Sequence, residues 1–83
     1  MNFFDQVKEK IKKKLNPENI IVIDISHLHS KHKSFDPKKF HLKLIIKSQK
    51  LKKMDKILAH KEIYSILKDE MEKKIHALEI EIN

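Results

Sequence analysis

Residues 20–47 read IIVIDISHLHSKHKSFDPKKFHLKLIIK, in which two apolar runs flank a polar segment that contains three histidines. The first run, residues 20–25, is short, β-branched and almost entirely apolar, a pattern typical of a strand that is covered on both faces or lies centrally in its sheet. In the second run, residues 40–47, apolar residues alternate with mostly polar ones, and this period of two predicts a strand with one buried face. The two runs are therefore interpreted as a hairpin with a long histidine-containing loop.

The sequence on either side of this stretch supplies two helices and a third strand. Residues 3–15 carry apolar side chains at steps of three and four, which predicts an amphipathic helix that the following Asn-Pro pair ends. Asp55 is the predicted N-cap of a second helix, whose apolar face continues to Met71 and whose last turn is rich in lysine. Residues 78–82 alternate again and predict the third strand. The order helix, strand, strand, helix, strand indicates an α+β fold with helices packed on one sheet, in a single domain of residues 1–83.

The composition restricts the class of protein. A chain of 83 residues, of which 40% are hydrophobic, is long enough for one domain with a modest core. The absence of cysteine excludes a disulfide scaffold, and residues 1–14 alternate charged and apolar side chains, unlike the apolar core of a signal peptide. No apolar run approaches the roughly 18 residues of a membrane span. We therefore expect a cytoplasmic protein.

The formal net charge of +7 at pH 7 suggests a nucleic-acid partner, because lysines that neutralise phosphates release counterions. All 19 basic residues are lysines, however, so the bidentate guanidinium that reads guanine or clamps phosphate is absent. Lysine, isoleucine and asparagine are abundant, as expected where a genome favours A/T-rich codons, and charged runs are usually solvated faces. The charge alone therefore does not assign nucleic-acid binding.

Six histidines in a chain without cysteine point instead to metal chemistry. His27, His29 and His32 crowd the predicted loop, and His76 precedes the last predicted strand. Neutral imidazole binds zinc, iron or copper, but without a thiolate in the chain a usual zinc or iron-sulfur site must take ligands from a partner. An enzyme is not expected, because the chain has no cysteine nucleophile or phosphate-binding loop and its acidic residues are scattered through charged helical segments.

Four segments of the chain, taken in order, resemble the BolA family. They read IDISHLH at residues 23–29, FHLKLIIKS at 40–48, AHKEIY at 59–64 and IHAL at 75–78. The resemblance spans nearly the whole chain, and the Ser-His-x-His loop together with the Ile-His-Ala-Leu strand start is fairly specific. BolA-like proteins have a fold similar to a class II KH domain, with the same order of helices and strands, so the resemblance implies that fold here.

The resemblance also implies a function and a set of ligands. BolA-like proteins pair with monothiol glutaredoxins, and a 2Fe-2S cluster can be held between the two proteins. By position, His76 corresponds to the carboxyl-terminal ligand and His29 to the loop ligand, which is histidine or cysteine among relatives. The glutaredoxin cysteine and a bound glutathione would supply the remaining ligands. Two histidines on one iron raise the reduction potential relative to all-thiolate ligation, and protonation of imidazole should loosen the cluster as pH falls, which suits iron-sulfur trafficking or iron and redox sensing.

Each candidate ligand also has an alternative. His76 shares its parity with Leu78, so spacing alone favours a structural, hydrogen-bonded histidine, whereas the resemblance favours a ligand. His27 and His32 are alternatives to His29 in the loop, and the loop histidines together would also bind adventitious zinc or nickel.

Other positions are assigned structural roles or depart from the family pattern. His60 lies on the apolar face of the second helix and is interpreted as a packing histidine, and His41 lies on the polar side of its strand, where it supports the sheet or a partner surface. Leu51 and Lys53 replace the aromatic residue and the glycine of the family's Ser-x-x-Phe-x-Gly stretch, and Ala59 stands where an arginine is common. These changes affect the turn and partner contacts but leave both candidate ligands in place.

A DNA-binding transcriptional regulator is the alternative function, because BolA-like proteins have been associated with transcriptional control and the expected fold resembles KH modules. A KH domain clamps the nucleic-acid backbone with a Gly-x-x-Gly loop, and this chain has no glycine, so KH-type RNA binding is not expected. Binding of DNA to lysine-rich helix faces would be strongly salt-sensitive. A homodimer is also compatible with the sequence.

Overall fold

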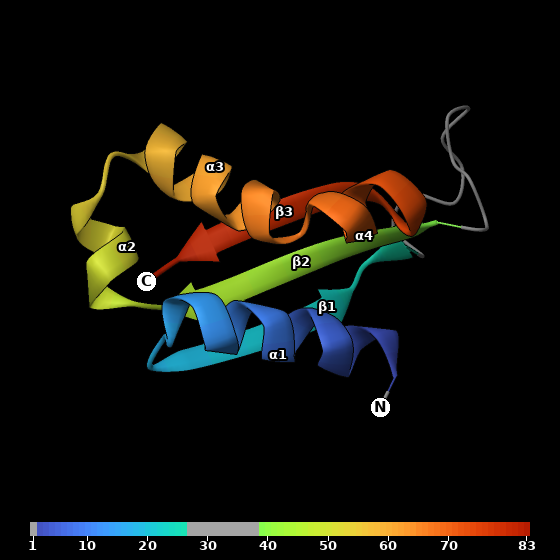
Figure 1. Ribbon diagram of the computed structural model, residues 1–83, viewed down its shortest axis with the longest axis horizontal. Helices are drawn as coiled ribbons and strands as arrows, with labels where there is room; N and C mark the ends of the chain where they lie inside the picture. Colours follow the sequence, from blue (N-terminus) through green and yellow to red (C-terminus); the bar gives the residue numbers. More distant parts are fainter. Residues whose placement is uncertain (1, 27–38) are drawn as a thin grey trace.

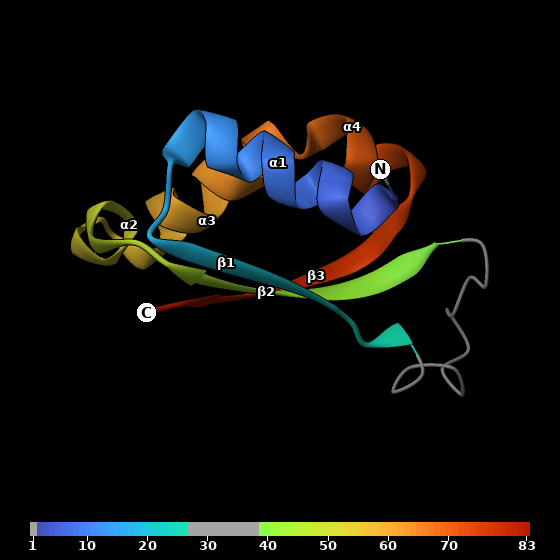
Figure 2. The ribbon, with the colours of Figure 1, turned by 90° about the horizontal axis from the view of Figure 1, so that it is seen from below.

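The computed structural model describes residues 2–26 and 39–83 as a three-stranded sheet with helices on one face (Figure 1, Figure 2). The elements, in chain order, are α1 (Phe3–Leu15), β1 (Asn19–Asp24), β2 (Phe40–Lys47), α2 (Gln49–Lys53), α3 (Lys56–Ile66), α4 (Lys68–Lys73) and β3 (Ile75–Ile82). β1 pairs antiparallel with β2, and β3 pairs parallel with β2, so β2 is the central strand. The predicted α+β arrangement is confirmed. None of the described helices is long and apolar enough to cross a membrane.

α1 forms where the sequence predicts it, and asparagines cap both of its ends. The side chain of Asn2 accepts a hydrogen bond from the Asp5 N–H (2.8 Å) at the amino end. At the carboxyl end, Asn16 adopts the left-handed conformation (φ 46°) that glycine usually takes there, and its N–H donates to the Lys12 carbonyl (2.9 Å). The inward face of the helix carries three buried residues: Val7, Ile11 and Leu15.

The core lies between the helices and the sheet. On β2, alternate residues point toward the helices and are fully buried, namely Leu42, Leu44 and Ile46. β1 adds Ile20, and the helices add the buried side chains of Val7, Ile11, Ala59, Ile63 and Leu67. Each fully buried side chain of leucine or isoleucine size contributes about 1.5–3 kcal/mol relative to an exposed one. The buried row on β2, which the helices cover, is therefore a substantial part of the stabilising core.

β1 does not occupy its predicted position. It is an edge strand that pairs only with β2 among the described residues, and its outward-facing Ile21 and Ile23 are 44% and 38% exposed. The prediction of a strand covered on both faces or placed centrally is wrong, because α1, α3 and α4 all lie on one side of the sheet (Figure 2). The opposite side, called here the open face, carries the exposed isoleucines.

The second predicted helix is divided in the structure. α3 ends at Ile66 and α4 begins at Lys68, and the intervening Leu67 leaves helical geometry (φ −98°, ψ 19°) while its side chain stays fully buried. The short helix α2, capped by Ser48, precedes them and was not predicted. The prediction of one helix over residues 55–74 is wrong in this respect. A bend leaves the apolar spacing within each half unchanged, so the sequence pattern does not reveal it.

Candidate metal-ligand site

The candidate ligand His76 lies in a β-bulge near the start of β3. Phe40 of β2 is opposite Ile75, but His41 is opposite Ala77, so His76 is the additional residue between two paired positions. Ile75 is buried and anchors the strand, whereas His76 is exposed. The bulge changes the alternation along the strand, so His76 does not share the inward face of the later residues of β3. The spacing-based interpretation of His76 as a structural core histidine is therefore wrong.

His41 lies directly beside His76 on the neighbouring strand. The centroids of the two imidazole rings are 4.9 Å apart, and the ring planes are inclined by 35°. His41 is on the open face of β2, as predicted, but only 6% of the residue is exposed. Its backbone N–H donates to Ser26 Oγ (3.0 Å), and its carbonyl accepts from the Ile25 N–H (2.8 Å). His41 thus connects the end of β1 with the start of β3.

The remaining candidate ligands, His29 and its alternatives His27 and His32, lie outside the described residues. The described chain stops at Ser26 and resumes at Lys39, and both of these residues are next to the β2 end that carries His41.

The exposed imidazole of His76, on a strand paired with β2, is accessible to a metal ion. The ring nitrogens of neutral histidine bind zinc, iron or copper. In residues 2–26 and 39–83, no group of three or more His, Cys, Asp or Glu side chains is arranged to hold a metal ion. A metal ion bound by His76 would therefore need its further ligands from outside the described residues.

His60 lies at the margin of the packed face of α3, and not in its middle as the sequence predicts. The buried residues of α3 are Ala59 and Ile63, whereas Ile57 is 67% exposed and His60 is half-buried. The inward face of the helix is therefore rotated relative to the predicted apolar stripe. The prediction followed the large apolar side chains, and a small inward-facing alanine gives little signal.

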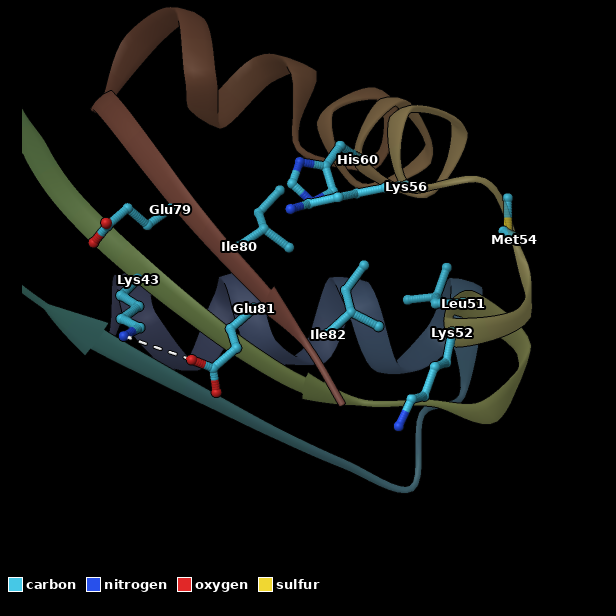
Figure 3. Close-up of a pocket in the computed structure, with 10 residues that line it drawn as sticks. All are labelled: Lys43, Leu51, Lys52, Met54, Lys56, His60, Glu79, Ile80, Glu81 and Ile82. Carbon is cyan, nitrogen blue, oxygen red and sulfur yellow. Dashed lines mark ion pairs between the residues drawn. The ribbon is translucent and has the colours of Figure 1, made fainter.

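A cavity beside His60 was not found from the sequence. It has a volume of about 490 Å³ and lies between α2, α3 and β3, where Lys52, Lys56 and His60 line it together with Ile80 and Ile82 (Figure 3). Lys43 of β2 also lines it and pairs with Glu81 (3.8 Å), whereas Lys52, Lys56 and His60 come from α2 and α3, so their arrangement depends on the turn between these helices. The only signal in the sequence is lysine on both sides of that turn, and lysine is too common in this chain to be selective.

Comparison with known proteins gives consistent matches in sequence and structure. Residues 11–83 match the family described as BolA-like protein. A Haemophilus influenzae protein named DNA-binding transcriptional regulator BolA is 30% identical over 76 residues, which cover 92% of this chain and 71% of that protein. Protein BOLA1, chloroplastic, of Arabidopsis thaliana is 27% identical over 84 residues, and the match covers 95% of this chain but only 51% of the relative. The solved BolA domain of SufE1 from Arabidopsis thaliana superposes with a TM-score of 0.83 at 30% identity, over 100% of this chain and 92% of that one.

Proposed function

Because this chain belongs to the BolA-like protein family, we propose that it is a non-enzymatic adaptor that pairs with a monothiol glutaredoxin and shares a 2Fe-2S cluster with it. The observation that carries the proposal is the exposed imidazole of His76 in the β3 bulge, at the end of the sheet where the histidine-containing segment begins and ends. The role of such an adaptor is iron-sulfur trafficking or iron and redox sensing.

In this proposal the chain supplies two imidazole ligands. His76 is one, and His29 is the other, with His27 and His32 as alternatives. The partner supplies a cysteine and a bound glutathione. When bound, a cluster with histidine ligands has a higher reduction potential than one with thiolates alone. The imidazoles must be deprotonated to bind iron. As the pH falls, ligation by the imidazoles of this chain therefore weakens before ligation by the partner's thiolates does.

The test is anaerobic reconstitution of the protein with a monothiol glutaredoxin, glutathione, iron and sulfide, followed by visible circular dichroism. We expect the wild type to give a mixed-complex spectrum that differs from the glutaredoxin homodimer. His76→Ala should abolish it, and His60→Ala, which removes a half-buried histidine at the distant cavity, should not. A wild type that leaves the homodimer spectrum unchanged would refute the proposal.

The loop ligand is assigned by the same spectrum. We expect His29→Ala to change or abolish the mixed-complex signal, while His27→Ala and His32→Ala leave it intact. Loss of the signal with one of the latter two variants, and not with His29→Ala, would transfer the role to that histidine.

DNA binding is a second candidate, which the cavity beside β3 favours. Lys52, Lys56 and His60 line this cavity and concentrate positive charge there (Figure 3). Glu79 and Glu81 line it as well and offset part of that charge. The Haemophilus influenzae relative carries DNA binding in its name, which adds support.

Fluorescence anisotropy with a labelled DNA duplex tests this candidate. Affinity measured between about 50 and 200 mM salt should fall steeply if lysines neutralise phosphates. The double variant Lys52→Gln/Lys56→Gln should reduce the slope of log K against log salt by about 2, roughly 1 per phosphate contact. Lys8→Gln/Lys13→Gln on α1 removes the same charge and is the control. An equal reduction of the salt slope by the two double variants would contradict a role for the cavity.

A further inference from the structure

We infer that His41 is a positioning residue that holds the imidazole of His76 in one orientation for metal ligation. The inference rests on the proposed function for the ligand role of His76. The contact between the two rings, however, involves residues of this chain only and needs no partner. His41 is 6% exposed, whereas Ile21 and Ile23 on the same open face of the sheet are 44% and 38% exposed. His41 is therefore far more buried than these two residues, although it lies on the same open face.

His41 is fixed by pairing on both sides of the central strand. Its N–H donates to Ser26 Oγ (3.0 Å) and its carbonyl accepts from the Ile25 N–H (2.8 Å) on the β1 side, and Ala77 is its register partner in β3. These bonds limit movement of the backbone, and burial limits the rotamers of the side chain. His41 therefore provides a rigid base.

The ring of His76 rests on this base. The two rings are tilted by 35°, and the separation of 4.9 Å between their centroids is within the range of interacting aromatic pairs, about 4.5–7 Å. Among residues 2–26 and 39–83, the side chain of His76 makes no hydrogen bond or ion pair, so the contact with the His41 ring is what orients it. An exposed side chain without such a contact samples several rotamers, and a metal or partner must then select one of them. The ring of His41 thus holds the imidazole of His76 in one orientation before a metal binds.

Two substitutions of His41 separate ring contact from simple filling of space. His41→Phe keeps an aromatic ring at this position, whereas His41→Leu keeps an apolar side chain and removes the ring. We expect His41→Leu to raise about tenfold the glutaredoxin concentration that gives half of the mixed-complex dichroism, as for other residues that orient a metal ligand. His41→Phe should remain close to the wild type. Far-ultraviolet dichroism and the melting temperature establish that each variant is folded, and His41→Met replaces His41→Leu if the latter is not.

A second measurement uses the metal-free protein. Nuclear magnetic relaxation of the His76 Cε1–H group should report a well-ordered ring in the wild type and in His41→Phe, and a more mobile ring in His41→Leu. Equal mobility in all three proteins would overturn the inference. A glutaredoxin titration of His41→Leu that matches that of the wild type would also overturn it. So would a His41→Phe variant that forms the mixed complex as weakly as His41→Leu, because the ring nitrogens of His41, and not the ring contact, would then be what matters.

These two measurements distinguish the inference from the proposed function. If the wild type forms no mixed complex but the order of the His76 ring depends on an aromatic residue at position 41, the cluster proposal fails and the positioning role stands. If the mixed complex forms and His41→Leu changes neither measurement, the cluster proposal stands and the positioning role fails.

Discussion

At the scale of single residues, Glu70 carries the buried carboxylate of the described part of the chain. Its side chain is 7% exposed, and the Lys10 amino group donates to Glu70 Oε1 (2.9 Å) and Oε2 (3.2 Å). This ion pair joins α1 to α4, two helices that lie side by side over the sheet (Figure 2). Removing one partner from a buried pair costs more than the pair contributes, because a charge is left in a poorly solvated position.

We expect Lys10→Met to lower the free energy of unfolding by about 1–3 kcal/mol, the cost of a buried polar group that loses its partner. Lys10 is 36% exposed, so water partly replaces it and the lower half of this range is expected. Urea unfolding followed by circular dichroism measures the change. Lys12→Met is the control, because the pair of Lys12 with Glu9 is long (3.9 Å) and exposed on both sides. Equal losses for the two variants would assign the effect to lysine removal in general.

Asn16 is the residue for which backbone geometry gives a prediction. It occupies the left-handed region at the end of α1 (φ 46°), in a chain that has no glycine. Asn16→Ala should destabilise the protein by about 1 kcal/mol, because a Cβ without a compensating polar group disfavours this conformation. Asn16→Gly should be neutral or slightly stabilising in thermal unfolding. If glycine were as harmful as alanine, the asparagine side chain, and not the dihedral angle, would be the important feature.

The residues of the candidate site illustrate what spacing can predict. His76 was identified through its resemblance to a family ligand, whereas the parity argument placed it with the core. One additional residue in a bulge reverses parity, and nothing in the sequence of residues 75–78 marks that bulge. The burial of His41 was missed for a related reason, because it depends on neighbours from β1 and β3 that are distant in the sequence.

At the scale of elements, α2 depends on a buried cap. Ser48 is 2% exposed, and its Oγ accepts a hydrogen bond from the Leu51 N–H (3.2 Å). Ser48→Ala should cost about 1 kcal/mol, typical of a lost N-cap. Ser65→Ala on the exposed side of α3 is the matched control and should change the free energy of unfolding by less than about 0.5 kcal/mol. Denaturant titration of both variants checks this, and similar values for the two serines would contradict the capping role.

Elements with strong periodicity were predictable, and short or bent ones were not. α1 and β2 each repeat their apolar residues often enough to define a period. α2 has five residues and one buried side chain, Leu51, so it has no period to detect. The separation of α3 from α4 at Leu67 depends on tertiary packing, which the local pattern does not encode.

At the scale of the whole molecule, β1 is an edge strand that pairs on one side only among the described residues, and such strands are prone to self-association. The strand is rich in β-branched residues, its outward Ile21 and Ile23 are partly exposed, and no lysine or proline interrupts it. Edge strands of this kind template pairing with other chains.

The order of strands was not derivable from residue patterns, because it depends on the long-range parallel pairing of β2 with β3.

We expect Ile21→Lys to reduce concentration-dependent association while leaving the free energy of unfolding nearly unchanged, since a charge on an edge strand opposes pairing. Sedimentation velocity over a range of protein concentrations measures the association. Ile57→Lys adds the same charge at an exposed helical isoleucine and is the control. An equal reduction by both variants would attribute the effect to net charge and exclude the edge.

The contact between His41 of β2 and His76 of β3 joins two strands that three helices separate in the chain, so it exists only when these strands have paired. A ligand that requires the two rings to be adjacent binds the native state more tightly than the unfolded chain. By mass action, such a ligand at 100 times its dissociation constant raises the free energy of unfolding by about 2.7 kcal/mol. Occupancy of the site and stability of the fold are therefore linked equilibria, and the melting temperature of the protein should rise with the concentration of any ligand that binds there.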